Sequence, residues 1–196
     1  MSRNPRSKLS SDASLQLLKK RSTTKTDGMG HAIKRRQTAR DVFITPKALA
    51  MQHIAETANF CSNSACWFDP FKNSGSYYDQ FPSDNKKWCE ILENRDFFTY
   101  DVGHVDVICS NPPYSLMDKV FERSREYNPD IISYLIGVNN LTTKRMEEMN
   151  KEGYALVYVK MLKVMSWFGM SFICIWKKCD APNVIQYDRK IWKMDQ

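Results

Sequence analysis

The sequence has little of what metal centres, disulfide frameworks and membrane spans require. Its three histidines are well separated and show no metal-ligand spacing, which argues against a zinc site. Its six cysteines form no Cys-x-x-Cys pair, so we expect reduced thiols in an intracellular, cytoplasmic protein. No apolar run reaches the roughly 18–20 residues of a membrane span, and the first residues lack the apolar core of a secretory signal. We therefore expect a globular protein with neither a metal nor a membrane partner.

Acidic residues are scarce at the start of the chain. Residues 1–40 carry 11 Lys and Arg against 2 Asp and Glu, whereas the remainder carries 18 against 20. We predict a basic, disordered arm over 1–40, in which Lys34, Arg35 and Arg36 meet nucleic acid or act as a nuclear localisation signal. A solvated tail without either role is the alternative. The 196 residues suit one domain, which we place at 41–180, followed by a C-terminal extension at 181–196.

Short apolar runs alternate with helical patterns along the proposed domain. A helix is predicted from Thr45-Pro46, with Thr45 as N-cap and Pro46 at the first helical position, and another helix is predicted after Tyr114. The apolar runs predict strands at residues 65–68, 88–92, 105–109, 131–138, 155–159 and 171–176. This alternation indicates an α/β sheet with helices on its faces, closed by a strand pair around Gly169.

The most informative stretch is Ser110-Asn111-Pro112-Pro113-Tyr114, directly after the predicted strand at 105–109. Two prolines stop that strand, and each biases the residue before it toward an extended backbone. An amide, a proline carbonyl and an aromatic ring are therefore held on a stiff bend at the carboxyl end of a strand. Ligands of open α/β sheets bind at that end. A proline-rich turn that only caps the strand is the alternative interpretation.

The order of several motifs resembles that of a known enzyme family. The motifs are Phe43-Ile44-Thr45-Pro46, Asp69-Pro70-Phe71-Lys72-Asn73-Ser74-Gly75, Glu90, Asp96-Phe97-Phe98 and Asn111-Pro112-Pro113-Tyr114. Over residues 41–180 this order resembles the S-adenosylmethionine-dependent N6-adenine methyltransferases of the gamma arrangement, in particular the small phage- and virus-type enzymes. The resemblance implies a trimmed Rossmann-like class I methyltransferase fold, with a mostly parallel sheet and an antiparallel closing strand.

The resemblance implies that Asn111, Pro112, Pro113 and Tyr114 are catalytic. An adenine N6 amino group is a poor nucleophile because its lone pair is delocalised into the ring. If the Asn111 side-chain oxygen and the Pro112 carbonyl accept its two hydrogens, the lone pair can point at the sulfonium methyl group. Tyr114 would offer a flat face on which the base stacks outside the duplex. Catalysis would then be mostly positioning and electrostatics.

The resemblance also implies a cofactor site for S-adenosylmethionine. Asp69 would reach its ammonium group, Glu90 its ribose hydroxyls and Asp96 its adenine amino group, while Phe97 would stack on the adenine. Asn73 stands where the related loop, Asp-Pro-x-x-Gly-x-Gly, has its first glycine. We expect the turn to survive because Asn tolerates a left-handed backbone. The implied cofactor-binding residues are Phe43, Thr45, Asp69, Pro70, Phe71, Asn73, Gly75, Glu90, Asp96 and Phe97.

Simpler roles are open for several of these residues. Asp69 would cap a turn, Glu90 and Asp96 would be solvated acids, and Phe97 would be a core residue. The spacing of Glu90 and Asp96 adds a structural expectation. The usual fold has a helix and a strand between these two positions, and this chain has no room for both. A strand or a helix should therefore be missing.

No separate target-recognition domain follows Tyr114. Recognition would need the basic arm, the segment 138–153 with Lys144 and Arg145, the tail, or a partner protein. The resemblance favours DNA as substrate, with RNA as a close variant. Two alternatives stay open. One is a protein glutamine N5-methyltransferase, because those that modify release factors share the Asn-Pro-Pro-Tyr motif. The other is a catalytically degenerate methyltransferase-like subunit that binds nucleic acid.

Overall fold

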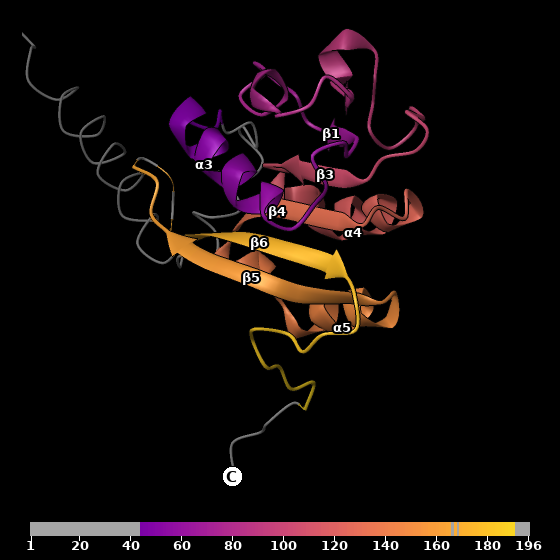
Figure 1. Ribbon diagram of the computed structural model, residues 1–196. Helices are drawn as coiled ribbons and strands as arrows, with labels where there is room; N and C mark the ends of the chain where they lie inside the picture. The colour runs from indigo at the N-terminus through magenta and orange to yellow at the C-terminus, as the bar shows by residue number, and fades with distance from the viewer. Residues whose placement is uncertain (1–43, 166, 168, 191–196) are drawn as a thin grey trace, which may run out of the picture. The chain divides into compact units, whose positions relative to one another are not determined.

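The computed structural model describes residues 44–165, 167 and 169–190, so the predicted arm at 1–40 lies outside the described residues (Figure 1). The helices and strands in chain order are α3 (Lys47–Ala58), β1 (Trp67–Asp69), η1 (Tyr78–Gln80), β2 (Lys86–Trp88), η2 (Ile91–Glu93), β3 (Val107–Ser110), η3 (Tyr114–Leu116), α4 (Met117–Glu126), β4 (Ile131–Gly137), η4 (Val138–Asn140), α5 (Thr143–Lys151), β5 (Tyr154–Leu162) and β6 (Ser171–Lys178). Elements labelled η are single 3-10 turns. No helix in these ranges is long and apolar enough to cross a membrane.

Six strands form one sheet in the order β2-β1-β3-β4-β6-β5. The first four strands in that order are parallel, and β6 runs antiparallel to both of its neighbours. The sheet is therefore mostly parallel with one antiparallel closing strand. This confirms the fold class expected from the sequence, and the strand pair β5 and β6 is joined around Gly169, whose φ is +74°.

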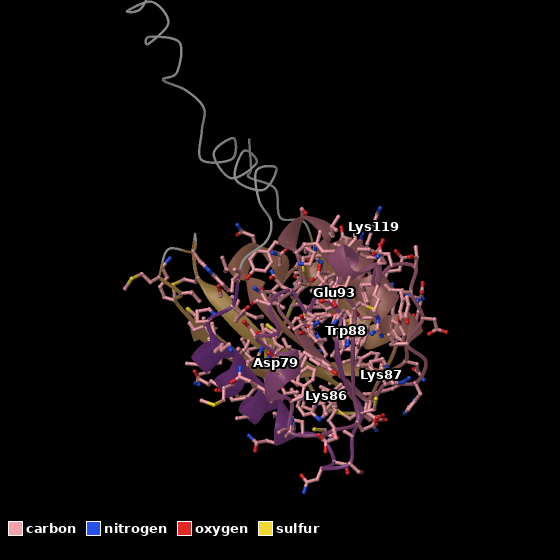
Figure 2. The ribbon with its side chains drawn as sticks, turned by 90° about the horizontal axis from the view of Figure 1, so that it is seen from above. Asp79, Lys86, Lys87, Trp88, Glu93 and Lys119 are labelled. Carbon is pink, nitrogen blue, oxygen red and sulfur yellow. The ribbon has the colours of Figure 1, made fainter. Side chains whose placement is uncertain are left out.

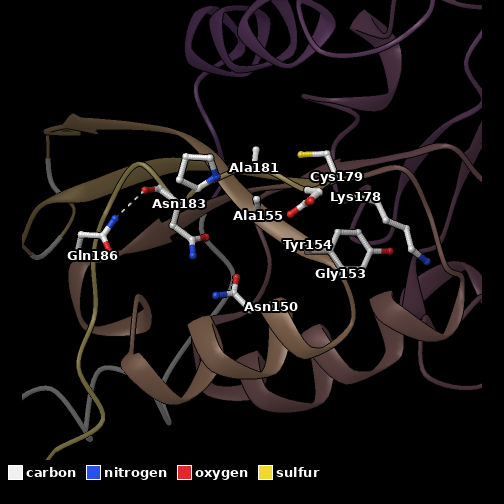
Figure 3. A pocket seen from close by; sticks show the side chains of 11 residues that line it. Asn150, Gly153, Tyr154, Ala155, Lys178, Cys179, Ala181, Asn183 and Gln186 are labelled. Atoms are coloured by element: carbon white, nitrogen blue, oxygen red, sulfur yellow. Dashed lines mark hydrogen bonds between the residues drawn. The ribbon is translucent and has the colours of Figure 1, made fainter.

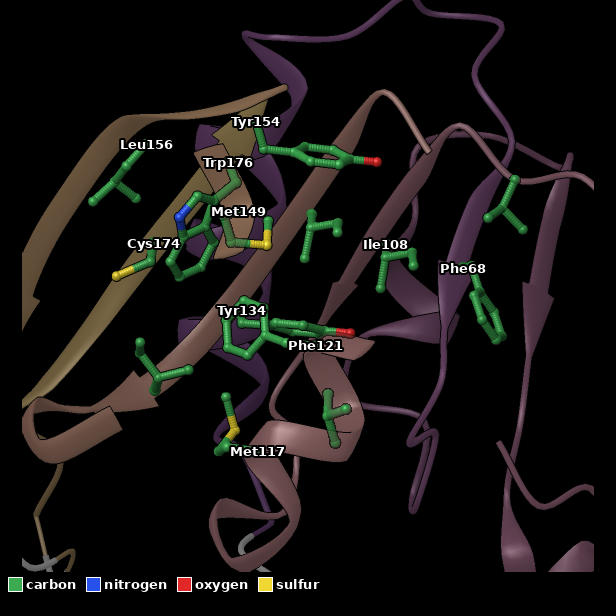
Figure 4. Close-up of a cluster of buried hydrophobic side chains, with 14 of the residues drawn as sticks. Phe68, Ile108, Met117, Phe121, Tyr134, Met149, Tyr154, Leu156, Cys174 and Trp176 are labelled. Carbon is green, nitrogen blue, oxygen red and sulfur yellow. The ribbon is translucent and has the colours of Figure 1, made fainter. Parts of the chain in front are cut away.

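The alternation of side chains along the central strands builds two buried clusters, one on each face of the sheet. Along β3, Ile108 joins one cluster, whereas Val107 and Cys109 join the other. The first cluster lies under α4 and α5, and Figure 4 shows Phe121, Tyr134 and Trp176 within it. The second cluster lies under α3. The sheet is thus covered by helices on both faces (Figure 1).

The sheet is short at its β2 end, as the spacing of Glu90 and Asp96 predicted. Between β2 and β3 the described chain has the 3-10 turn η2 but no strand. We predicted a strand at 88–92, whereas β2 ends at Trp88 and η2 begins at Ile91. Ile91 and Leu92 are 67% and 89% exposed, so this apolar pair does not enter the sheet. The Glu90 side chain accepts a hydrogen bond from the Leu92 amide, which favours the turn.

Two local expectations about helices differ from the structure. Helix α3 begins at Lys47 with Pro46 as its N-cap residue, and no side chain caps it. Thr45 is therefore not the cap that we predicted, because its side chain points to a different partner. The segment 138–153, to which we assigned no secondary structure from the sequence, contains helix α5. Its N-cap is Thr142, whose side chain accepts from the Arg145 amide, and Met146 and Met149 are buried beneath it.

Candidate functional site

The carboxyl ends of the parallel strands β1, β3 and β4 bring together residues that are far apart in the sequence. These ends are Asp69, Ser110 and Gly137. The turn between β5 and β6 reaches the same end of the sheet, because Ser171 pairs with both Gly137 and Leu162. We call this region the carboxyl end of the sheet. It holds the Asn-Pro-Pro-Tyr bend and the loop after β1.

Asp69 is the buried acid of this region and has no exposed surface. Its Oδ1 accepts hydrogen bonds from Ser110 Oγ at 2.7 Å and from the Phe71 amide at 3.1 Å. Its Oδ2 is buried and makes no hydrogen bond of normal geometry among the described residues. Burial raises the pKa of Asp69 to about 7, although the bonds from Ser110 and Phe71 oppose the rise. Asp69 thus caps a turn through Oδ1, and the Tyr78 backbone is a further group that favours its charged form.

The predicted catalytic bend follows directly after Ser110. Pro112 is buried, Asn111 is partly buried, and Pro113 has an extended backbone with φ −65° and ψ 120°. Asn111 Nδ2 donates a hydrogen bond to Thr45 Oγ1 at 3.2 Å. Thr45 is in turn only 5% exposed. The segment before α3 therefore lies against the bend and holds one end of the Asn111 amide.

Tyr114 packs against the end of the neighbouring strand. A Cβ added at Gly137 would lie 3.2 Å from Cε2 and 3.5 Å from Cδ2 of Tyr114, which is tighter than ordinary contact. The missing side chain at Gly137 therefore lets the ring approach the backbone of β4. Asn140 also lies here, with Nδ2 3.7 Å from the same added Cβ. The ring of Tyr114 is placed by β4 as well as by its own bend.

The loop after β1 has the backbone that we expected at Asn73, whose φ is +47°. Gly75 has φ +85°, and a Cβ there would lie 2.4 Å from Oδ2 of Asp79. The space that glycine leaves at this position is filled by Asp79 rather than open. Pro70 is buried, and Phe71 packs edge-on against Phe97 at 5.1 Å between ring centroids. These residues shape the loop beside Asp69.

Glu90 and Asp96 are both engaged with backbone amides. Glu90 Oε2 accepts from the Asn73 amide at 2.8 Å, and Glu90 Oε1 accepts from the Leu92 amide at 3.1 Å. Asp96 Oδ1 accepts from the Phe98 amide at 3.0 Å. Glu90 therefore ties the loop after β1 to the end of β2. A ribose would have to share these oxygens, which is feasible because each carboxylate oxygen has two lone pairs.

Phe97 is a core residue in this structure. It is 2% exposed and lies among the rings of Phe68, Phe71, Phe98 and Tyr127. Its ring therefore has no open face on which a cofactor could stack, and the prediction of stacking is replaced by the simpler core role. The physical reason is that the short connection after β2 carries Phe97 straight into the cluster under α4.

A cationic and aromatic cluster borders the loop after β1. Lys72 Nζ lies 4.1 Å from the Trp88 ring centroid, and Arg95 Cζ lies 3.9 Å from it. Lys72 also forms an ion pair of 2.8 Å with Glu93, and Figure 2 labels Trp88 and Glu93. These contacts hold Lys72 and, with the Glu90 bond to Asn73, fix one side of the loop.

The basic residues predicted to bind nucleic acid differ in their exposure and in their ion pairs. Lys144 is exposed and lies 3.6 Å from Glu148. Arg145 is 11% exposed, pairs with Asp118 at 2.9 Å and donates to the Asn140 carbonyl at 2.6 Å. Arg145 thus joins α4, η4 and α5, so we correct its assignment to a structural one. Phe43 and the run Lys34, Arg35 and Arg36 lie outside the described residues.

Several residues of the site were not assigned from the sequence. Ser110 is buried against Asp69, and Ser76 Oγ donates to the Thr45 carbonyl at 2.8 Å. Gly137 admits the Tyr114 ring. The role of Ser110 could have been predicted from the sequence, since Ser110 lies between the predicted strand and the Asn-Pro-Pro-Tyr bend. The roles of Ser76 and Gly137 could not have been predicted from the sequence, because they depend on contacts with residues more than twenty positions away.

A separate hollow of about 550 Å³ lies at the other end of β5 and β6. Figure 3 shows Asn150, Lys178 and Asn183 among the residues that line it. It contains none of the predicted catalytic or cofactor-binding residues. No group of three or more His, Cys, Asp or Glu side chains in the described ranges is arranged to hold a metal ion.

The strand order is that of a Rossmann-like fold of the kind that methyltransferases have. No protein-family model matches the chain, and no curated protein matches it. Among solved structures, a chain of the E. cuniculi Mtq2–Trm112 complex, responsible for the methylation of the eRF1 translation termination factor, has a TM-score of 0.50 and 14% identity, covering 72% of this chain and 100% of that chain. This likeness supports the fold.

Two further structures are similar at lower scores. M. capricolum TrmK in complex with S-adenosyl-homocysteine has a TM-score of 0.48 and 10% identity, covering 68% of this chain and 70% of that chain. A methyltransferase from Pyrococcus furiosus has a TM-score of 0.44 and 16% identity, covering 87% of this chain and 100% of that chain.

Proposed function

We propose that this chain is an S-adenosylmethionine-dependent methyltransferase that methylates the N6 amino group of adenine in DNA, with RNA as a close variant. One arrangement carries the proposal: the Asn111-Pro112-Pro113-Tyr114 bend at the carboxyl end of β3, joined to Asp69 through Ser110. The fold supports methyl transfer as the class of reaction, since one structure of similar fold comes from a complex responsible for the methylation of a translation termination factor.

The residues after β1 suit S-adenosylmethionine at its charged end. The buried Oδ2 of Asp69, which makes no hydrogen bond of normal geometry among the described residues, would accept from the ammonium group. A nearby cation would restore the charge of a carboxyl whose pKa burial has raised to about 7. Glu90 and Asp96 would share their oxygens between their present amide donors and the cofactor. When bound, the cofactor supplies an electrophilic sulfonium methyl group.

The bend supplies acceptors for the target amino group. Thr45 holds Nδ2 of the Asn111 amide, so its Oδ1 is the end that accepts a hydrogen from the N6 amino group. The Pro112 carbonyl accepts the other hydrogen. These two acceptors would direct the nitrogen lone pair toward the methyl group that the cofactor supplies, and the methylated nitrogen would afterwards lose a proton to water. No group has to act as a strong base, so positioning dominates the rate.

Substrate contacts would come from the residues around the bend. Tyr114, held against Gly137, would stack on a base that has left its helix. Lys144 at the start of α5 is exposed and can approach a phosphate. The arm with Lys34, Arg35 and Arg36 is proposed to add sequence-independent affinity. We also propose that a partner protein supplies target recognition, because α5 is the sole helix in the described part of the chain between β4 and β5.

A protein substrate is the second candidate. Its support is the fold likeness to a chain from a complex that methylates a translation termination factor. Exposed apolar side chains at the carboxyl end of the sheet favour it too: Val138 is 44% exposed and Met170 is 37% exposed, and the Val138 amide donates to the Met170 carbonyl. Apolar surface beside a site is more typical of protein contacts than of phosphate contacts. In that case Asn111 would hold a glutamine amide nitrogen.

The test is to incubate the full chain with methyl-labelled S-adenosylmethionine and separate pools of DNA, RNA and protein. We expect label in DNA, and digestion to nucleosides should place it on N6-methyl-2′-deoxyadenosine. Asn111→Ala is the matched negative control, because it removes the amide and leaves the loop after β1 unchanged. Calorimetry on both proteins should give similar cofactor affinity.

The outcomes separate the candidates. Label on glutamine in the protein pool would replace the first candidate by the second. Label in RNA alone would keep adenine methylation and change the substrate. No label in any pool together with no cofactor binding would overturn the enzymatic proposal and leave a methyltransferase-like binding subunit.

A further inference from the structure

Thr45 lies between the two halves of the proposed site. The sequence placed it near the cofactor, and the structure places it against the catalytic amide. Its Oγ1 accepts from Asn111 Nδ2 at 3.2 Å, and its carbonyl accepts from Ser76 Oγ at 2.8 Å. Ser76 belongs to the loop after β1 and is buried. One residue thus bridges the loop that would hold the cofactor and the amide that would hold the substrate.

An amide side chain needs such a partner because its two ends are similar in shape and opposite in hydrogen-bonding character. The proposed reaction requires the oxygen to face the target amino group. Thr45 Oγ1 can accept from the Asn111 NH2 group, whereas a methyl group in its place can accept nothing. Without that acceptor, rotation by 180° would present a donor to the substrate amino group, which is itself a donor.

A second bond fixes the backbone of the same bend. Ser110 Oγ donates to Asp69 Oδ1 at 2.7 Å, and both residues are fully buried. The residue before Asn111 is thus tied to the acid that would meet the cofactor. The amide is tied to the cofactor loop through Thr45 and Ser76. One connection joins the end of β3 to the end of β1, and the other joins the bend after β3 to the loop after β1.

We propose that Thr45 is a positioning residue that sets the orientation of the Asn111 amide and couples it, through Ser76, to the loop after β1. The role in transfer rests on the proposed function, whereas the amide orientation stands on the hydrogen bonds alone. Thr45 does not touch the reacting atoms. Its loss should lower the rate of transfer on bound substrate far more than it lowers cofactor affinity.

The experiment uses the full chain and four single variants: Thr45→Val, Thr45→Ser, Thr57→Val and Ser76→Ala. Thr45→Val removes the acceptor hydroxyl, and Thr45→Ser keeps it. Thr57→Val removes a buried threonine hydroxyl outside the site, where Thr57 bonds to the His53 carbonyl and to Ser133. Single-turnover transfer at saturating cofactor and nucleic acid is measured with cofactor Kd and Tm. A further readout is the Asn111 side-chain NH2 signal in 15N-resolved NMR of the cofactor-free protein.

We expect Thr45→Val to lower the saturated rate about 30-fold or more, while cofactor Kd changes by no more than about threefold. Thr45→Ser should restore the rate to within about threefold of wild type. Thr57→Val should lower Tm and leave the saturated rate unchanged. Ser76→Ala should have a smaller effect of about 3–10-fold that does not add to that of Thr45→Val, since both act through one connection.

Different results overturn different claims. Wild-type rates in Thr45→Val, or a loss confined to cofactor Kd, would refute the positioning role while leaving the proposed function intact. A wild-type protein that methylates nothing would refute the proposed function. The NMR readout then still tests the orientation: the Asn111 NH2 signal should shift in Thr45→Val and not in Thr57→Val. An unchanged signal in Thr45→Val would refute the inference by itself.

Discussion

Asp69 and His53 are both completely buried, yet their surroundings differ. His53, on α3, uses both ring nitrogens: Nδ1 lies 2.9 Å from the Tyr77 hydroxyl and Nε2 lies 2.7 Å from Ser133 Oγ. Asp69 has two donors on one oxygen and none of normal geometry on the other among the described residues. All hydrogen-bonding atoms of the His53 ring under α3 therefore have partners. One carboxylate oxygen of Asp69, at the carboxyl end of the sheet, makes no hydrogen bond of normal geometry among the described residues.

The difference separates a buried group whose polar atoms are all paired from one that, in our proposal, also binds the cofactor. Burial lowers the pKa of His53 to about 3 and raises the pKa of Asp69 to about 7. The neutral His53 is fully satisfied, so it contributes stability above its unfolded pKa near 6.5. Asp69 opposes folding at pH values where it is charged, because its unfolded pKa is near 3.8. Binding sites commonly accept such costs in the ligand-free state.

The largest effect that we expect is a loss of methyl transfer from a substitution at the carboxyl end of the sheet, the region of Asp69. Asn111→Ala should lower the rate of methyl transfer by about 10³-fold, because it removes the acceptor that holds the target amino group. Stability should change by less than about 1 kcal/mol, since Asn111 is only partly buried. Quenched transfer assays and urea denaturation on the same preparation check both statements. Full activity in this variant would make the bend a structural turn.

The second largest effect that we expect is on stability, from a substitution of His53 under α3. His53→Ala should destabilise the fold by about 2–4 kcal/mol, because it opens a cavity and removes partners from Tyr77 and Ser133. Cofactor affinity of the folded protein should change little. Urea titration measures the loss, and calorimetry well below the unfolding midpoint measures the affinity. A loss of less than about 0.5 kcal/mol would mean that this network does not stabilise the fold.

Asp69→Asn tests how much stability the fold loses by burying the charged carboxylate of Asp69. We expect the ligand-free variant to be more stable than wild type by about 1–3 kcal/mol at pH 8, since it removes a buried charge. The advantage should shrink as pH falls from 7 toward 4, where wild-type Asp69 binds a proton in the fold. Cofactor affinity should fall at least about tenfold. Denaturation at pH 8 and pH 5 checks the sign, and equal stability differences at both values would contradict it.

The smallest effect concerns the loop backbone. Asn73 holds φ +47°, so Asn73→Gly should change stability by less than about 1 kcal/mol and preserve cofactor affinity. Asn94→Gly, at φ +60° in the turn after η2, is a matched control for the same backbone change. A large loss of affinity in Asn73→Gly alone would show that the Asn73 side chain itself contacts the ligand.

Local patterns in the sequence predicted the elements that local physics controls. The apolar runs at 105–109 and 131–138 become β3 and β4, because a continuous apolar segment is stable only where both faces of a strand are buried. The left-handed backbone at Asn73 followed from residue type. The position of the Asn-Pro-Pro-Tyr bend after β3 followed from proline chemistry. The spacing of Glu90 and Asp96 also predicted that a strand or a helix is missing, and no strand lies between β2 and β3 in the described chain.

Tertiary contacts determined the features of the site that local sequence patterns did not predict. The burial of Phe97, the ion pair of Arg145 with Asp118 and the bond from Asn111 to Thr45 join residues that are distant in sequence or depend on a distant neighbour. Residue type and spacing carry no signal for such contacts, since the same threonine can cap a helix or accept from an amide. Only the fold brings β1, β3 and the start of α3 together, and only there does Thr45 find Asn111 as its partner.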